Sequence, residues 1–262
     1  MSSILPLHRL SRRRLLEVLA AGAVIAPLVG ACSENVATGR QQLVLVSDEM
    51  LAQLSEQAWR DLQRQTPRVG DTRVQQRLEA IGRGVADASG LTNVNWEFVA
   101  FESHEVNAFV LPGGKVGFFR GLIELAASDG EIAAVMGHEV GHVAARHAAE
   151  RLSQQLIVSA GVQAAQVVLS EEMGEHADEA AAALGLGLMY GVVLPYSRAH
   201  ELEADRLGVD VMRNAGYSPH DAVSFWRRMS ADSIGGGQTL AWLSTHPTND
   251  ERLRVLEQLA ST

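Results

Sequence analysis

The five-residue stretch His138-Glu139-Val140-Gly141-His142, called the pentad below, places two histidines four residues apart, with a glutamate directly after the first. In a helix, residues four apart lie one turn apart on one face, so both imidazoles can reach one zinc ion. The glutamate then lies beside water that the metal activates, where it can act as a general base. The same pattern also arises by chance, so this interpretation depends on the segment being helical.

The residues around this stretch predict a helix over residues 129–152. Ser128 and Glu131 have the spacing of a capping box, in which a serine precedes a glutamate by three positions. Apolar residues then recur at intervals of three and four, and form a core-facing stripe: Ile132, Val135, Met136, Val140 and Val143. The two histidines lie off this stripe, on an adjoining face.

Two glycines, Gly137 and Gly141, interrupt the same helix. Each costs about 1 kcal/mol in a helix interior relative to alanine. We expect them to let a neighbouring segment approach the metal closely, although they can also be weak helix positions that are simply tolerated.

A catalytic zinc site usually has three protein ligands and a water. In one class of metallopeptidases the third ligand is a histidine six residues after the second, but Ala148 holds that position here. His147 is five residues after His142 and falls on a different face, so we interpret it as a solvated helix residue.

A later acidic segment supplies a candidate third ligand. Glu201 and Asp205 are four apart and share a helix face, whereas Glu203 points about 200° away from Glu201. We predict Glu201 as the ligand and Asp205 as the acceptor for the free ring N–H of a zinc histidine. An ordinary solvated helix would also carry such acids, and His200 is a weaker ligand candidate that faces elsewhere.

Taken together, these motifs resemble the gluzincin metallopeptidases of the HtpX and CAAX-prenyl-protease type, metallopeptidase family 48, and within it the periplasmic lipoprotein branch. The resemblance runs from about residue 36 to the C-terminus, and Thr38-Gly39-Arg40-Gln41-Gln42 resembles the start of the mature proteins. It implies an α+β, mostly helical, zincin-like catalytic domain with a small β-sheet or hairpin beside the helix of the pentad, and one Zn²⁺ per chain. The matching residues are Asn107-Ala108-Phe109, Leu111-Pro112-Gly113-Gly114, Gly121-Leu122, His138 to His142, Ser197-Arg198, Glu201, Glu203-Ala204-Asp205 and Thr245-His246-Pro247.

Strand patterns precede the pentad. Residues 96–101 alternate as a strand does, and residues 107–111 and 116–119 flank a turn at Pro112-Gly113-Gly114-Lys115. Such a hairpin suits an edge that binds an extended peptide by strand addition, or it merely closes a small sheet. The resemblance implies the substrate role for Asn107, Ala108 and Phe109.

His246 lies in a Thr-His-Pro turn after the glycine-rich residues 233–237. The resemblance implies that it lies near the metal, where it would either fill the fourth zinc position as a latch or stabilise the oxyanion. The alternative is a histidine at the entry to a helix over residues 249–260. We interpret His104, His176 and His220 as surface residues.

The N-terminus has the form of an export signal. A basic Ser11-Arg12-Arg13-Arg14 segment resembles a twin-arginine signal, although ordinary secretion fits as well, and an uncharged run over residues 18–31 follows. Val29-Gly30-Ala31-Cys32 resembles a lipobox, and Cys32, the only cysteine, would carry the lipid. Ser33 rather than aspartate favours the outer membrane. The alternative is a soluble exported protein that is cleaved elsewhere.

We therefore expect residues 1–31 to be a signal and residues 32–262 to be one zinc metallopeptidase domain. The net charge is −9, and removing residues 1–31 leaves 18 basic and 30 acidic residues, or −12, which argues against nucleic-acid partners. Helical patterns cover residues 48–65, 71–89, 129–152, 155–172, 177–194, 197–215 (with Ser197 as N-cap), 218–231 and 249–260. The uncharged run 180–197 is interpreted as a buried helix rather than a membrane span, and no tandem-repeat arm is expected.

The expected function is zinc-dependent endopeptidase activity on the periplasmic side of a bacterial cell envelope, with a lipid anchor in the outer membrane. The resemblance implies unfolded, misfolded or stalled envelope and outer-membrane proteins as substrates. A lipoprotein assembly factor or chaperone with latent or weak protease activity is the alternative.

Overall fold

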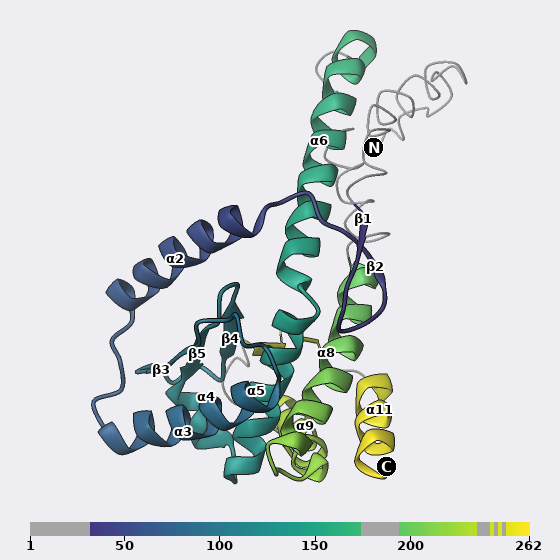
Figure 1. The fold of residues 1–262 in the computed structure, drawn as a ribbon. Helices are drawn as coiled ribbons and strands as arrows, with labels where there is room; N and C mark the ends of the chain where they lie inside the picture. The colour runs from purple at the N-terminus through teal and green to yellow at the C-terminus, as the bar shows by residue number, and fades with distance from the viewer. Residues whose placement is uncertain (1–31, 174–193, 235–241, 244–245, 248–249) are drawn as a thin grey trace, which may run out of the picture.

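The computed structural model describes residues 32–173, 194–234, 242, 243, 246, 247 and 250–262. The expected export signal, His176, the glycines at 235–237 and most of the uncharged run 180–197 lie outside these residues. Within them, helices dominate and two small sheets accompany them (Figure 1), so the predicted mostly helical α+β class is confirmed. The elements in chain order are β1 (Cys32–Glu34), β2 (Gln41–Leu43), α2 (Asp48–Gln65), α3 (Thr72–Ala88), β3 (Glu97–Phe101), β4 (Ala108–Leu111), β5 (Lys115–Phe119), α4 (Arg120–Leu125), α5 (Asp129–Ala144), α6 (His147–Met173), α8 (Leu194–Asn214), α9 (Pro219–Ile234) and α11 (Asp250–Ala260).

The larger sheet has the strand order β3-β5-β4. β3 is parallel to β5, and β4 pairs with β5 as the predicted antiparallel hairpin, whose turn uses Gly113 and Gly114 at a φ of 87° each. Only glycine adopts this backbone conformation without strain. β4 is the edge of the sheet in the described part of the chain, so its outer side is where a further strand would add.

Helix α5 lies at the centre of the fold, packed against α3, α8, α9 and β4 (Figure 1). Every residue from Gly130 to Gly141 is buried. Ser128 caps the helix as predicted, because its hydroxyl accepts a hydrogen bond from the Glu131 amide at 3.1 Å. Glu131 does not return the bond to Ser128; its carboxylate accepts from the Ala127 amide and pairs with Arg228 of α9.

The glycines of α5 allow α8 to approach, as expected. A Cβ on Gly137 would lie 2.7 Å from the carbonyl oxygen of Gly208, and one on Gly141 would lie 2.7 Å from that of Ala204. Both distances are shorter than a van der Waals contact. The backbones of α5 and α8 therefore touch beside the pentad.

Two predicted helix limits are wrong. The helix expected over residues 129–152 ends at Ala144, and α6 starts at His147 after Arg146, which has a φ of 53°. Ser197 is not an N-cap, because α8 already begins at Leu194. Pro195 is compatible with that start. Proline has no backbone N–H, and the N–H groups in the first turn of a helix have no partner within the helix.

The N-terminal elements lie across the rest of the molecule. The β1–β2 hairpin runs beside α6 and α8, and α2 spans the space above the larger sheet (Figure 1). Trp59 anchors the far half of α2, because it packs edge-on against Phe101 and Phe109. No described helix combines the length and apolarity needed to cross a membrane.

Candidate metal centre

The two histidines of the pentad face one point. His138 and His142 lie one turn apart on α5, and their Nε2 atoms are 3.1 Å apart. His138 is buried and His142 is nearly so. The helical spacing that the sequence suggested therefore brings two imidazoles together.

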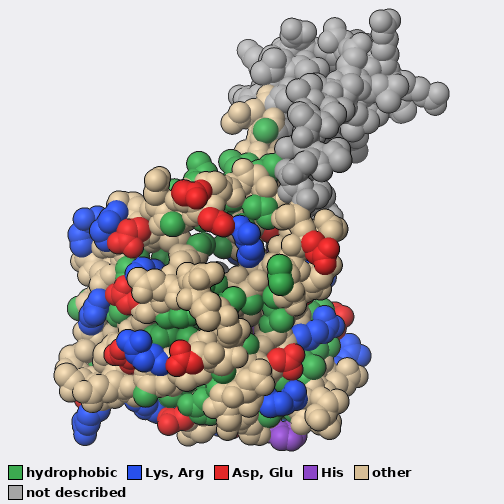
Figure 2. Space-filling model, in the orientation of Figure 1, with side chains coloured by type: hydrophobic (Ala, Val, Ile, Leu, Met, Phe, Trp, Pro, Cys, Tyr) green, Lys and Arg blue, Asp and Glu red, His purple; other side chains and the backbone are tan. Residues whose placement is uncertain are grey.

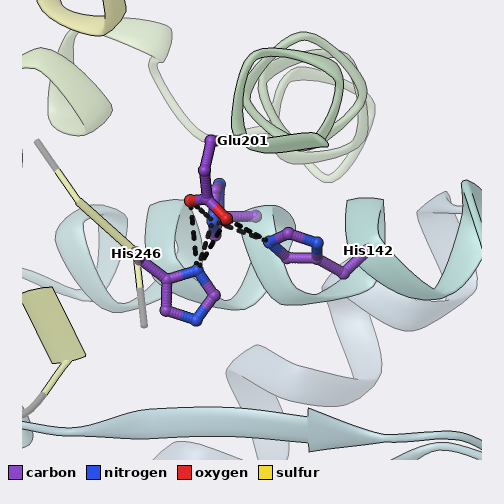
Figure 3. A group of neighbouring side chains, drawn as sticks. His142, Glu201 and His246 are labelled. Atoms are coloured by element: carbon purple, nitrogen blue, oxygen red, sulfur yellow. Dashed lines mark hydrogen bonds and ion pairs between the residues drawn. The ribbon is translucent and has the colours of Figure 1, made fainter. Parts of the chain in front are cut away.

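Glu201 reaches the same point from α8. One carboxylate oxygen is 3.3 Å from His138 Nε2, and the other is 3.5 Å from His142 Nε2. Figure 3 shows the carboxylate between the rings of His142 and His246. The close contact of α5 and α8 at Gly141 and Ala204 makes this reach possible.

His246 completes the group from the segment before α11. Its Nδ1 atom is 3.1 Å from Glu201 Oε2 and 3.3 Å from His138 Nε2. One ligand atom from each of these four residues lies within 4.8 Å of the others.

These distances fit a zinc ion. Zinc–nitrogen bonds of about 2.0–2.1 Å in a tetrahedron place neighbouring ligand atoms about 3.3 Å apart. The separations named above run from 3.1 to 3.5 Å. Imidazole nitrogen and carboxylate oxygen are also ligands that zinc accepts, so the donor set and its spacing both suit this metal.

Glu139 lies beside the four residues rather than among them. It is buried, the indole Nε1–H of Trp242 donates to its Oε1 at 3.2 Å, and His246 Nε2 is 3.5 Å from the same oxygen. A carboxylate held in this way is positioned to exchange a proton with a group bound at the metal position. No sequence motif indicated Trp242.

Asp205 lies behind His138, on the side away from the metal position. Its Oδ1 is 2.9 Å from His138 Nδ1, the arrangement expected for the acceptor of a ligand's free ring N–H. Arg252 of α11 donates to both oxygens of Asp205 at 2.7 Å and lies 2.9 Å from Glu201 Oε2. No sequence pattern pointed to Arg252, because it belongs to an ordinary amphipathic helix.

Burial and pairing set the charges of the site. Burial opposes protonation of His138, but hydrogen bonds to Asp205 and Glu201 outweigh it and raise its pKa to about 9. Burial, together with the nearby His138, lowers the pKa of His142 well below its usual value. Burial would raise the pKa of Glu201, yet hydrogen bonds with His138 and His246 hold it far below its ordinary range. Glu201 is therefore anionic.

His147 is not the solvated residue that its spacing suggested. It is buried, its Nδ1 lies 2.8 Å from His142 Nδ1, and its Nε2 lies 2.9 Å from Glu203 Oε2. Burial lowers its pKa. The prediction was wrong because the break at Arg146 resets the helical phase, so a spacing of five no longer means a different face.

The remaining histidines are outside the metal group. His200 is buried against Glu150 at 3.0 Å and stacks on His147, so it faces away from the metal position as expected. His104 and His220 are exposed, as predicted.

A cavity of about 720 Å³ opens in front of the site. Its walls include Glu139, His142 and His246 at one end, β4 along one side and the first turns of α2 above. Figure 2 shows the surface hollowed between α2 and the sheet. The residues predicted for a substrate strand, Asn107, Ala108 and Phe109, all line this cavity.

Within the described residues, part of the outer edge of β4 has no strand partner. The Asn107 carbonyl accepts from the Phe119 amide at 2.9 Å, so Asn107 belongs to the set of residues that bond inward to β5. In an antiparallel pair such residues alternate with ones whose amide and carbonyl point outward. Ala108 and Val110 therefore direct their backbone groups away from β5. Just before β4, the outward side of the chain is already bonded, because the Trp242 amide donates to the Val106 carbonyl at 3.1 Å.

Comparisons with known proteins agree with this geometry. The model for "Peptidase family M48" matches residues 72–260, and peptidases of this family are zinc-dependent. Similar proteins include the mitochondrial metalloendopeptidase OMA1 of Schizosaccharomyces pombe, 37% identical over 65% of this chain and 48% of its own length. The OMA1 of Arabidopsis thaliana is 35% identical over 72% of this chain and 36% of its length.

A bacterial relative matches more of the chain at lower identity. The beta-barrel assembly-enhancing protease of Escherichia coli is 23% identical over 94% of this chain and 52% of its own length. The chain thus spans about half or less of these relatives. Since the family model covers most of the chain and the pentad lies within the match, the chain belongs to peptidase family M48.

Proposed function

We propose that this protein is a zinc-dependent endopeptidase that cleaves extended polypeptides. The observation that carries the proposal is the convergence of His138, His142 and Glu201 on one point at the end of an open cavity, with the Glu139 carboxylate beside it. Named relatives are metalloendopeptidases, which supports the same reaction class.

His138, His142 and Glu201 would hold the metal. When bound, zinc supplies Lewis acidity, which lowers the pKa of water toward about 7 and polarises the scissile carbonyl. Glu139 accepts the proton of the attacking water at its carboxylate and passes it to the leaving amine. The burial of Glu139 keeps bulk water from competing for that proton.

The open edge of β4 would orient the substrate. A peptide that adds as a strand would pair with the outward backbone groups of Ala108 and Val110 and run along the cavity toward Glu139. Main-chain pairing of this kind reads little of the sequence, which suits a peptidase for unfolded or misfolded proteins.

The placement of His246 favours a latent form. Its Nδ1 lies within reach of the same metal position as His138 and Glu201, where it would compete with water for a bound zinc ion. His246 must therefore leave this position before catalysis. Of the two roles inferred from the sequence, the latch fits this position better than the oxyanion role, because Nδ1 lies at the metal position itself.

We further propose that the protein acts at the periplasmic side of a bacterial envelope, anchored through Cys32 in the outer membrane, on misfolded or stalled envelope proteins. The lipobox-like residues before Cys32 support the anchor. The name of the Escherichia coli relative supports a link to β-barrel assembly. A second candidate is an assembly factor that binds clients with little turnover, and the latched position of His246 favours it.

Cleavage of an unfolded protein, with bound zinc quantified, tests the function. We expect Glu139→Gln to bind zinc and lose cleavage by about 10²-fold or more, because the proton acceptor is gone. We expect His246→Ala to retain zinc and cleave faster, because the fourth zinc position opens. If wild type and both variants bind zinc and none cleaves, the assembly-factor function gains and the peptidase proposal fails.

A further inference from the structure

We propose that Arg40 and His147 are positioning residues for the zinc ligand His142. His147 contacts His142 directly, and Arg40 acts on His147 through Glu203. This inference rests on the proposed zinc site. We call the four residues Arg40, Glu203, His147 and His142 the Arg40 relay. It reaches outside the matched family region, because Arg40 precedes residue 72.

The first contact of the relay fixes the ring of His142. Its Nδ1 is 2.8 Å from His147 Nδ1, and His147 Nε2 is 2.9 Å from a carboxylate oxygen of Glu203. A carboxylate only accepts, so His147 Nε2 carries the hydrogen and, in a neutral ring, His147 Nδ1 is an acceptor. His142 must then donate from Nδ1, which leaves the lone pair of its Nε2 pointing at the metal position.

The second contact fixes Glu203. Arg40 donates from Nε to Glu203 Oε1 at 2.7 Å and from one terminal nitrogen to Oε2 at 3.1 Å. The same guanidinium donates to both oxygens of Glu150 on α6, at 2.8 and 2.7 Å. Arg40 thus holds α6 and α8 at a fixed spacing through two forked contacts, a geometry that lysine cannot copy.

The segment that carries Arg40 is itself hydrogen-bonded to the C-terminal end of α5, the helix that carries His138 and His142. The Asn35 side chain donates to the Ala144 carbonyl at 3.3 Å, and the Gln42 side chain donates to the Ala145 carbonyl at 2.6 Å. The last carbonyls of a helix have no partner within it. Side chains from residues 35–42 therefore supply the hydrogen-bond donors for the carbonyls that follow His142. These carbonyls lie at the break between α5 and α6, which turns His147 toward His142.

The two zinc histidines are therefore supported in parallel ways. His138 is backed by Asp205 and then by Arg252, whereas His142 is backed by His147, Glu203 and then Arg40. In the first set, Asp205 follows from the motif Glu-x-x-x-Asp on α8, and only Arg252 comes from elsewhere. The second needs residues from the N-terminal segment, the break after α5 and α8, so no single motif reveals it.

Zinc affinity of the purified full chain, measured by competition with a chelator, tests the relay. We expect Arg40→Met and His147→Phe each to weaken zinc binding about 10- to 100-fold, the usual effect of losing a partner of a metal ligand. Arg40→Lys should recover only part of the affinity. The double variant should bind zinc no more weakly than the poorer single variant, because both changes break one chain of contacts.

Arg120→Met is the matched control. Arg120 of α4 also bridges two glutamates, Glu102 and Glu124, at 2.8 and 2.6 Å, but these side chains are 36% to 55% exposed. It should leave zinc affinity unchanged. The absorption spectrum of the Co²⁺-substituted protein gives a second readout, since a reoriented His142 alters the ligand field and a merely looser fold does not.

The relay is overturned if Arg40→Met and His147→Phe lower the melting temperature of the metal-free protein but bind zinc as wild type does. Additive losses in the double variant overturn it as well. These measurements use no substrate, so a protein that binds zinc and cleaves nothing would refute the proposed peptidase and leave the relay standing or falling by itself.

Discussion

At the scale of single residues, the properties of the site depend on the hydrogen-bond partners of the two histidines as much as on the histidines themselves. His138 and His142 have similar positions on one helix, yet opposite shifts in pKa. Burial lowers both, but hydrogen bonds to Asp205 and Glu201 outweigh it at His138, whereas at His142 the nearby His138 adds to it. Asp205 is in turn neutralised by Arg252. The contribution of each partner can therefore be measured separately.

Asp205→Asn should weaken zinc binding about 10- to 100-fold. The amide keeps the size of the side chain but loses the charge that favours donation from His138 Nδ1. Chelator competition measures the effect.

Asp210→Asn is the control, since Asp210 lies on the same helix and pairs only with exposed Arg213 in the described structure. Equal zinc affinity in Asp205→Asn and wild type would contradict the role of Asp205.

At the scale of elements, the contact between α5 and α8 brings Glu201 to the two histidines. Gly141 and Ala204 touch there, and the contact leaves no room for a side chain on the glycine. Helix propensity and packing therefore oppose each other at this position, and packing decides the residue.

Gly141→Ala should destabilise the protein by about 1–3 kcal/mol, because the clash with the Ala204 carbonyl outweighs the gain in helix propensity. It should also weaken zinc binding, since α8 carries Glu201. Denaturant unfolding measures the first effect.

Gly84→Ala is the comparison for this change. Gly84 lies in α3, and a Cβ there would meet no atom within 4 Å. That variant should gain up to about 1 kcal/mol. A stabilised Gly141→Ala protein would show that the helices are free to separate.

Many of the helices and strands were predictable from the sequence. The capping serine, the hairpin at Gly113-Gly114 and the start of α11 follow from local patterns, and the structure has them. The break after Ala144 was not predictable, because the carbonyl partners that stabilise it come from Asn35 and Gln42, about 100 residues away. For the same reason His147 was misinterpreted and the roles of Trp242 and Arg252 were not predicted: all three depend on contacts between distant segments.

At the scale of the whole molecule, the N-terminal segment is joined to the catalytic helices by charge. Burial would raise the pKa of Glu150, but hydrogen bonds from Arg40 and His200 outweigh it and lower that pKa to about 2 from 4.5. A carboxylate with a lowered pKa in the folded state stabilises the fold fully above its unfolded pKa, and that stabilisation is lost as the pH falls toward the folded value.

Arg40→Met should therefore cost the most stability near neutral pH. The difference in unfolding free energy between wild type and variant should shrink as the pH falls from about 4.5 toward 2. Urea unfolding at several pH values measures it, with Arg120→Met as the control that changes little. A difference that stays constant over this range would show that Arg40 acts by packing and not by its charge.

The position of Arg252 also sets an order of assembly. It lies in the last described helix, yet it orients Asp205 and contacts Glu201, while His246 enters the site only shortly before it in the chain. A nascent chain on the ribosome has the pentad long before these residues emerge. Synthesis therefore completes the support of the metal centre only after the residues up to Arg252 have followed the pentad, and a chain truncated before residue 246 carries the motif of a peptidase without the means to orient it.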